Sequence, residues 1–140
     1  MKIYPLLLGL GLTLTYSLAY DANPKMQTYI GDLKSEAKKL DPNFTDFDAK
    51  RGEQIFLSEH IGKRGEPISC ASCHGKEITK EAKNVHTNKR IKPLAPSVNS
   101  ERLTDPKEVE KWLKRNFKDV YNREGSPLEK GDVLYYIQTK

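Results

Sequence analysis

An all-α fold is predicted for this 140-residue chain by three observations. Apolar residues recur at helical spacing in the segments 24–40, 45–59, 105–116 and 127–137. Helix-start signals precede several of these segments, with Ser, Thr or Asp at the cap and Pro at the first helical position. No strand with an alternating β-branched pattern precedes the only Cys pair. The elements therefore look helical throughout.

Residues 1–19 have the pattern of an export signal. Lys2 supplies the positive charge, Leu6 to Leu14 form a short apolar run, and Ser17-Leu18-Ala19 is a small-x-small cleavage site. The apolar run is short for a membrane span, although an uncleaved N-terminal anchor is the alternative. Cleavage removes 19 of the 140 residues and leaves 121, enough for one domain with a modest core. We therefore expect a periplasmic or otherwise exported protein.

The chain is basic, with a formal net charge of +5. An exported domain without interleaved aromatic and basic residues is a poor candidate for nucleic-acid binding. Steering toward acidic protein partners is a better use for the charge. A plain solvated surface is the alternative.

Residues 20–44 are predicted to be an N-terminal helical extension packed on the surface of a domain at 45–140. Its helix spans Pro24 to Leu40, and Asp41-Pro42-Asn43 ends it. The next helix is expected to begin near Thr45 and run to about Glu59. Thr45 and Asp48 have the spacing of a capping box. Gly52 on this helix indicates close approach of another helix.

The central motif is Cys70-Ala71-Ser72-Cys73-His74, which holds the only two cysteines of the chain. This is the pattern of covalent c-type haem attachment. Each thiol adds to a haem vinyl group, and the histidine then binds the iron. A zinc site would need His60 or His86 as further ligands, a redox dithiol would need a preceding strand, and a disulfide would leave His74 unexplained. One covalent haem c is the favoured interpretation.

The segment after the motif is strongly charged up to Lys92 and is predicted to be a solvated helix or loop. A stiff loop follows, with Pro93 and Pro96. The carbonyl of either proline is a candidate acceptor for the Nδ1 proton of His74, which would turn Nε2 toward iron. The alternative is that the two prolines only stiffen the loop.

The iron ligand opposite His74 is not predicted to be methionine. The chain has two methionines, Met1 in the export signal and Met26 in the extension, and neither follows the haem motif. A helix capped by Asp105 should cover this haem face. Its apolar stripe is Val109, Trp112 and Leu113, and it includes the amide of Asn116. That amide is a candidate iron ligand, and a hydrogen bond to backbone near the helix end is the alternative.

The last helix should begin at the capping box of Ser126 and Glu129, with Pro at its first position. Leu128, Leu134, Tyr135 and Ile137, with Gly131 among them, would form the face that crosses the Gly52 helix.

Several stretches together resemble the oxygen-binding class I cytochromes c of the sphaeroides haem protein family. They are Pro93-Leu94-Ala95-Pro96-Ser97, Leu103-Thr104-Asp105-Pro106, the run 109–116 and the run 129–134, and the similarity covers roughly residues 47–140. Gly52 followed by Phe56 resembles the first helix of class I cytochromes c. The resemblance implies a class I fold wrapped around one haem, with Trp112, Pro93 and Pro96 beside the cofactor.

The family resemblance further implies that Asn116 is the sixth iron ligand in the oxidised state and leaves on reduction. Family members often carry a cysteine after this asparagine, disulfide-bonded to one nearer the last helix. Phe117 and Gly125 stand at those positions here. His86 and nearby lysines are rival ligands, as is His60.

The predicted function is that of an exported monohaem cytochrome in electron transfer. A hard amide oxygen suits ferric better than ferrous iron, so reduction should open the sixth position to O2, NO or CO. A di-haem or membrane cytochrome is the expected redox partner. The alternative is a haem oxidoreductase acting on NO, O2 or peroxide, for which Arg115 and Tyr121 are the nearest acid–base candidates.

Overall fold

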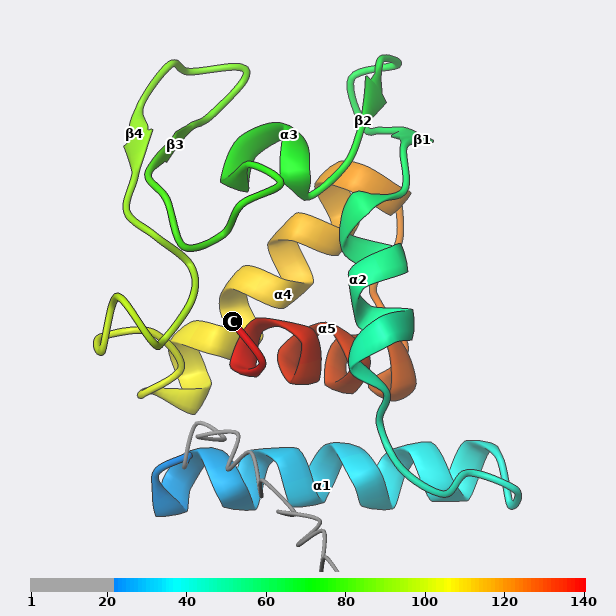
Figure 1. Cartoon of the computed structure of the whole chain (residues 1–140). Coiled ribbons are helices and arrows are strands. Elements are labelled where there is room, and N and C mark those ends of the chain that lie inside the picture. The colour runs from blue at the N-terminus through cyan, green and yellow to red at the C-terminus, as the bar shows by residue number, and fades with distance from the viewer. Residues whose placement is uncertain (1–21) are drawn as a thin grey trace, which may run out of the picture.

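The computed structural model describes residues 22–140, so the predicted export signal at 1–19 lies outside the described residues. This part of the chain forms five helices, joined by loops that hold four short strands, and Figure 1 shows their arrangement. None of the helices in residues 22–140 is long and apolar enough to cross a membrane. The elements in order are α1 Pro24–Leu40, α2 Ala49–Leu57, β1 His60–Ile61, β2 Pro67–Ile68, α3 Ala71–His74, β3 Ala82–Lys83, β4 Arg90–Ile91, α4 Pro106–Tyr121 and α5 Pro127–Gln138.

The crossing of α2 and α5 is the central contact of the fold. A Cβ atom on Gly52 would lie 1.9 Å from the carbonyl oxygen of Asp132, so only glycine permits this approach. The predicted crossing at Gly52 is therefore confirmed. Gly131 has a different role from the one predicted, because the ring of Phe47 occupies the space beside it, 2.2 Å from where a Cβ would stand.

The second helix is shorter than predicted, because it begins at Ala49 and ends at Leu57. Thr45 and Asp48 do not form a capping box. Asp48 is itself the cap, and its side chain accepts a hydrogen bond of 2.7 Å from the backbone N–H of Arg51. The backbone N–H of Asp48 in turn donates to the buried carboxylate of Asp132 on α5. A long-range contact therefore sets the start of α2.

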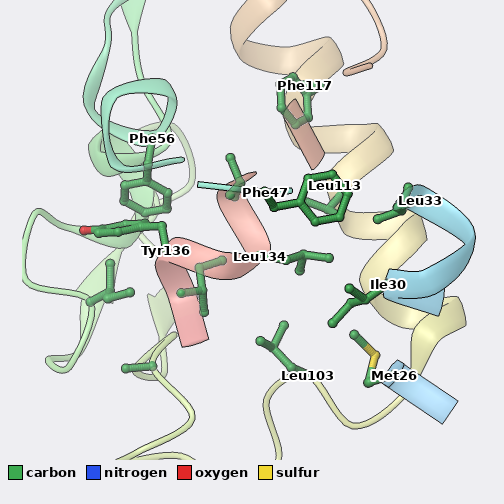
Figure 2. Close-up of a cluster of buried hydrophobic side chains, with 14 of the residues drawn as sticks. Met26, Ile30, Leu33, Phe47, Phe56, Leu103, Leu113, Phe117, Leu134 and Tyr136 are labelled. Carbon is green, nitrogen blue, oxygen red and sulfur yellow. The ribbon is translucent and has the colours of Figure 1, made fainter. Parts of the chain in front are cut away.

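The N-terminal helix spans the predicted residues Pro24–Leu40, but it is more than a surface extension. Figure 2 shows Met26, Ile30 and Leu33 directed into the same cluster of side chains as Leu113 and Leu134. Met26 is fully buried there. The α1 helix packs mainly on α5 and also on α4, so it shares the core of residues 45–140.

Two small antiparallel hairpins correct the prediction of an entirely helical chain. In one, His60 pairs with Ile68 and Ile61 pairs with Pro67. In the other, β3 pairs with β4 inside the charged segment after the haem motif. Strands of two residues are too short to show a period in sequence, which explains why the pattern did not reveal them.

Caps define the remaining helices as predicted. The side chain of Asp105 accepts from the backbone N–H of Lys107 at 2.9 Å and begins α4. Ser126 and Glu129 form the predicted reciprocal capping box at the start of α5, with bonds of 3.2 and 2.8 Å. Glu108, in the first turn of α4, pairs with Lys111.

Candidate haem site

The haem motif lies on α3, a single helical turn. The carbonyl of Cys70 accepts hydrogen bonds from the backbone N–H groups of Cys73, at 3.2 Å, and His74, at 3.0 Å. The backbone N–H of Ser69 donates to Oγ of Ser72, and the backbone N–H of Ser72 donates to Oγ of Ser69. This reciprocal pair closes the turn. This places the two thiols and the imidazole within one turn of backbone.

Both thiols are free, so neither is used in a disulfide. Burial in apolar surroundings raises the pKa of Cys70 to about 12. The thiol therefore stays neutral and is not poised for dithiol exchange. Two free thiols are what addition to two haem vinyl groups requires.

His74 has the protonation state of a metal ligand. Burial, with a smaller contribution from the positive charge of Arg102, lowers its pKa to about 4. The ring packs 6.2 Å from the ring of Phe56, between centroids. A neutral imidazole has a lone pair for iron. Its Nδ1 atom is buried and has no hydrogen-bond partner in the described residues, so this polar group is unsatisfied without further structure.

The predicted bond from His74 Nδ1 to a proline carbonyl is not formed in this structure. The Pro93 carbonyl accepts hydrogen bonds of 2.9 Å from Asn99 Nδ2 and from Arg102 Nε, which occupy both of its lone pairs. Pro96 is buried in the same loop. The choice of acceptor in the haem-loaded protein stays a prediction.

Arg102 was missed in the sequence because a lone cation in a loop usually indicates a solvated surface. Its guanidinium donates to the carbonyls of Pro93 and Lys92 and so closes the loop after the charged segment. Burial lowers its pKa. Its charge is close enough to His74 to disfavour the imidazolium form.

Asn116 lies on one flank of the buried stripe of α4. The buried residues of this helix are Leu113, Phe117 and Val120. Asn116 and Trp112, four residues apart, lie on one side of that stripe, and Tyr121 lies on the other. Trp112 is 46 % exposed and Asn116 is half-buried. An exposed indole beside a half-buried amide is a suitable surface for a flat apolar macrocycle to cover.

The amide of Asn116 makes no hydrogen bond within residues 22–140, and unlike the exposed Asn43 and Asn88, whose amides also make none, Asn116 is half-buried. The side chains of Asn23, Asn84, Asn99 and Asn122 all bond to backbone groups. The alternative read from the sequence, an amide bonded to backbone at the helix end, is therefore not what the structure shows. A half-buried amide without a partner is free to bind a ligand or an ion.

Phe117 and Gly125 fit each other directly. A Cβ on Gly125 would lie 2.7 Å from the ring of Phe117, so the ring occupies the space over the glycine. The ring centroid of Phe117 lies 5.3 Å from that of Tyr121, and the Tyr121 ring centroid lies 4.1 Å from that of His60. The segment after Asn116 is therefore held by aromatic packing.

The other candidate groups lie elsewhere. The hydroxyl of Tyr121 donates to the carbonyl of Ile55 at 2.7 Å, on the flank opposite Asn116. Arg115 is exposed and contacts the ring of Trp112. His60 and His86 are both exposed.

The donor set fits a covalently bound haem. Two free thiols and a neutral histidine lie on one turn, and the Nδ1 atom of His74 is a buried polar group that lacks a partner in the described residues. The half-buried amide of Asn116 is free to bind a further group.

Comparison with known proteins identifies relatives of this chain. Residues 42–137 match a family described as a domain of unknown function, DUF1924. Cytochrome c-type protein SHP of Cereibacter sphaeroides is 44 % identical over 90 residues, which cover 64 % of this chain and 69 % of that protein. Cytochrome c'' of Methylophilus methylotrophus is 31 % identical over 124 residues, covering 89 % and 74 %.

Solved structures give the same result for the fold. The structure of oxidised SHP, described as an oxygen-binding cytochrome c, superposes with a TM-score of 0.72 and 37 % identity over 82 % of this chain and 96 % of that one. Oxidised cytochrome c'' superposes with a TM-score of 0.74 and 28 % identity, over 83 % and 94 %. Haem c, covalently bound, is the cofactor of such proteins. The chain belongs to the DUF1924 family and is an all-α cytochrome c homologous to SHP.

Proposed function

We propose that this protein is an exported monohaem electron-transfer cytochrome in which Asn116 closes the sixth iron position when oxidised and vacates it on reduction. The observation that carries the proposal is the half-buried, unpartnered amide of Asn116 on α4. The haem supplies the iron that changes oxidation state and accepts a small diatomic ligand such as O2, NO or CO.

The residues around the site support a weakly held distal ligand. Met26, on α1, is fully buried in the core, so no methionine in residues 22–140 is available to the iron. Asn116 presents a hard oxygen that favours ferric over ferrous iron. No hydrogen bond in the described residues holds its amide in one rotamer, so withdrawal breaks no other contact of that group.

The relatives support the same reading. One is described as an oxygen-binding cytochrome c in its oxidised form. The solution structure of cytochrome c'' concerns the structural basis of haem-ligand detachment, and it matches this chain at 29 % identity with a TM-score of 0.73. One description thus concerns oxygen binding and the other concerns detachment of a haem ligand.

Asn116→Ala tests the assignment through paired absorption spectra of oxidised and reduced protein. The ferric spectrum should change from low-spin to high-spin, because the distal ligand is lost. The reduced spectrum should stay nearly the same, because Asn116 has already left the iron. Asn43→Ala, in an exposed loop, is the matched control and should change neither spectrum. An unchanged ferric spectrum for Asn116→Ala would reject the proposal.

Export is part of the same proposal, because c-type haem is attached outside the cytoplasm. Residues 1–19 would be removed after Ala19, so the mature protein should begin at Tyr20. Mass spectrometry of the haem-loaded protein checks this directly. A mass that retains residues 1–19 would indicate the anchor instead.

A further inference from the structure

Positive charge is concentrated in one segment of the chain. Residues 76–92 contain six Lys or Arg residues and two Glu residues, a net charge of +4, and the rest of the chain contributes only +1. The segment forms the β3–β4 hairpin and the loops beside it. All six cations are exposed. We call residues 76–92 the basic hairpin.

Half of these cations have no acidic partner. Lys80, Arg90 and Lys92 pair with Glu77, Glu81 and Glu101 respectively. Within residues 22–140, no ion pair joins Lys76, Lys83 or Lys89 to an acid. Exposed ion pairs are weak and screened, so the whole hairpin presents a positive potential.

The helix α4 offers a useful contrast. It also carries many cations, but Lys111, Lys114, Arg115 and Lys118 are all within ion-pair distance of acids on or next to the same helix. The net positive potential around α4 is therefore smaller than its number of cations alone would produce.

The basic hairpin is attached to the haem motif at its base. The strand β3 contacts α3, and a Cβ on Gly75 would lie 3.6 Å from the Cβ of Ala82. The carbonyl of Ile78 accepts the backbone N–H groups of Leu94 and Ala95, at 2.8 and 3.0 Å. Figure 1 shows the hairpin beside α3. A protein bound to it would lie next to the helix that holds the haem.

An apolar side chain is exposed within the same patch. Val85 lies between the two strands, on the connecting loop, and is 58 % exposed. A positive rim around an exposed apolar residue fits a protein surface, because protein interfaces pair a small apolar centre with complementary charge at the rim.

We propose that the basic hairpin is the docking surface for an acidic electron-transfer protein. The proposal rests on the proposed electron-transfer function. Complementary charge would steer the encounter and raise the rate of association at low ionic strength. The occupant is a protein with an acidic surface, and the hairpin sets where it approaches the haem motif.

The test measures haem reduction by stopped flow with two electron donors. Reduced plant-type ferredoxin is the acidic protein probe, and the uncharged lumiflavin semiquinone is the neutral one. The variant K76E/K83E/K89E should be reduced by ferredoxin about tenfold more slowly at low ionic strength. The rate with lumiflavin should stay unchanged. The rate at which ferredoxin reduces K76Q/K83Q/K89Q should lie between the rates for the parent protein and for K76E/K83E/K89E.

The matched control is K25E/K39E/K50E, which changes the net charge by the same amount. These lysines are exposed and lie on α1 and at the start of α2, away from α3 in Figure 1. Reduction of this control variant by ferredoxin should be slower than that of the parent protein by less than about twofold. Equal slowing by both variants, or no salt dependence in the parent protein, would overturn the hairpin as the docking surface. Failure of lumiflavin to reduce the parent protein would instead count against the electron-transfer function.

Discussion

In the proposed function α3 carries the proximal ligand His74 and α4 carries the distal ligand Asn116, and these two helices are built in contrasting ways. The helix α3 has four residues and no side chain capping its start. The helix α4 has sixteen residues, a capped start and a buried stripe. A helix of one turn gains little stability by itself, so its position would depend on the proposed covalent bonds to haem. Covalent attachment would then fix His74, whereas packing fixes the backbone of Asn116 but not its side chain.

Under the proposed function, this contrast would let one iron keep one ligand and release the other. His74 packs against Phe56 and is neutral at physiological pH. Asn116 is half-buried and has no partner in the described residues. Release of Asn116 would require movement of one side chain, while α4 stays in the core.

The largest effect is expected from removal of the proximal attachment. The double variant Cys70→Ala/Cys73→Ala should lose covalent haem completely, because no other cysteine exists in the chain. Haem-dependent staining after denaturing electrophoresis measures this loss. Covalent haem retained by the double variant would refute the role of the motif. Ser72→Ala, between the two cysteines, is the control and should keep its haem.

The next largest effect is expected from a distal ligand that stays bound to iron in both oxidation states. Asn116→Met places a thioether where the amide stands, and a thioether binds iron in both oxidation states. Carbon monoxide affinity of the reduced protein should fall about 100-fold, the factor that a competing bond of about 2.7 kcal/mol produces. Asn116→Leu has similar size and no donor, so it should bind carbon monoxide as the parent does. Similar affinity in the two variants would show that residue 116 does not face the iron.

A smaller effect is expected from a substitution that crowds the ring of Phe117 on α4. Gly125→Ala would place a Cβ 2.7 Å from the Phe117 ring. Overpacking of this kind should lower the free energy of unfolding by about 1 to 3 kcal/mol. Because Phe117 follows Asn116, the ferric spectrum should also gain a high-spin fraction. Urea unfolding and absorption spectra measure the two effects.

The control for Gly125 is Gly31, in the middle of α1. Nothing lies within 4 Å of a Cβ at Gly31, so Gly31→Ala should stabilise the protein by about 0.5 to 1 kcal/mol. Equal effects of the two substitutions would mean that the contact between Gly125 and Phe117 is not tight.

The smallest effect concerns the turn between α4 and α5. The ion pair with Arg123 lowers the pKa of Glu129 below its ordinary value of 4.5. This stabilisation is present above pH 4.5 and is lost as the pH falls through the lower, folded-state pKa. Since the pair is partly exposed, the loss between pH 6 and 3 should be about 0.5 kcal/mol. In Glu129→Gln, the urea midpoint should depend less on pH over this range, and an identical dependence would contradict the assignment.

Much of this fold could be predicted from the sequence, because it follows from interactions between residues close together in the chain. The bounds of α1 and the caps at Asp105 and Ser126 follow from interactions within one helical turn. Gly52 indicated the helix crossing, because a glycine inside a helix usually has a packing reason. The haem motif was equally local, since five consecutive residues carry it.

The parts that were predicted wrongly depend on long-range contacts. The start of α2 follows from the buried carboxylate of Asp132, 84 residues away from Asp48. The role of Gly131 depends on Phe47, which lies in a distant loop. The involvement of Arg102 with His74 is likewise visible only in three dimensions. Asn116 was found because its amide interrupts an apolar stripe, but its lack of partners required the structure.

The most direct test of redox-gated coordination is iron K-edge X-ray absorption of the same sample before and after reduction. The fitted coordination number should be six in the oxidised protein, with an oxygen or nitrogen ligand opposite His74, and five in the reduced protein. Six ligands in both states, or five in both, would contradict the claim that Asn116 binds the oxidised iron and leaves the reduced one.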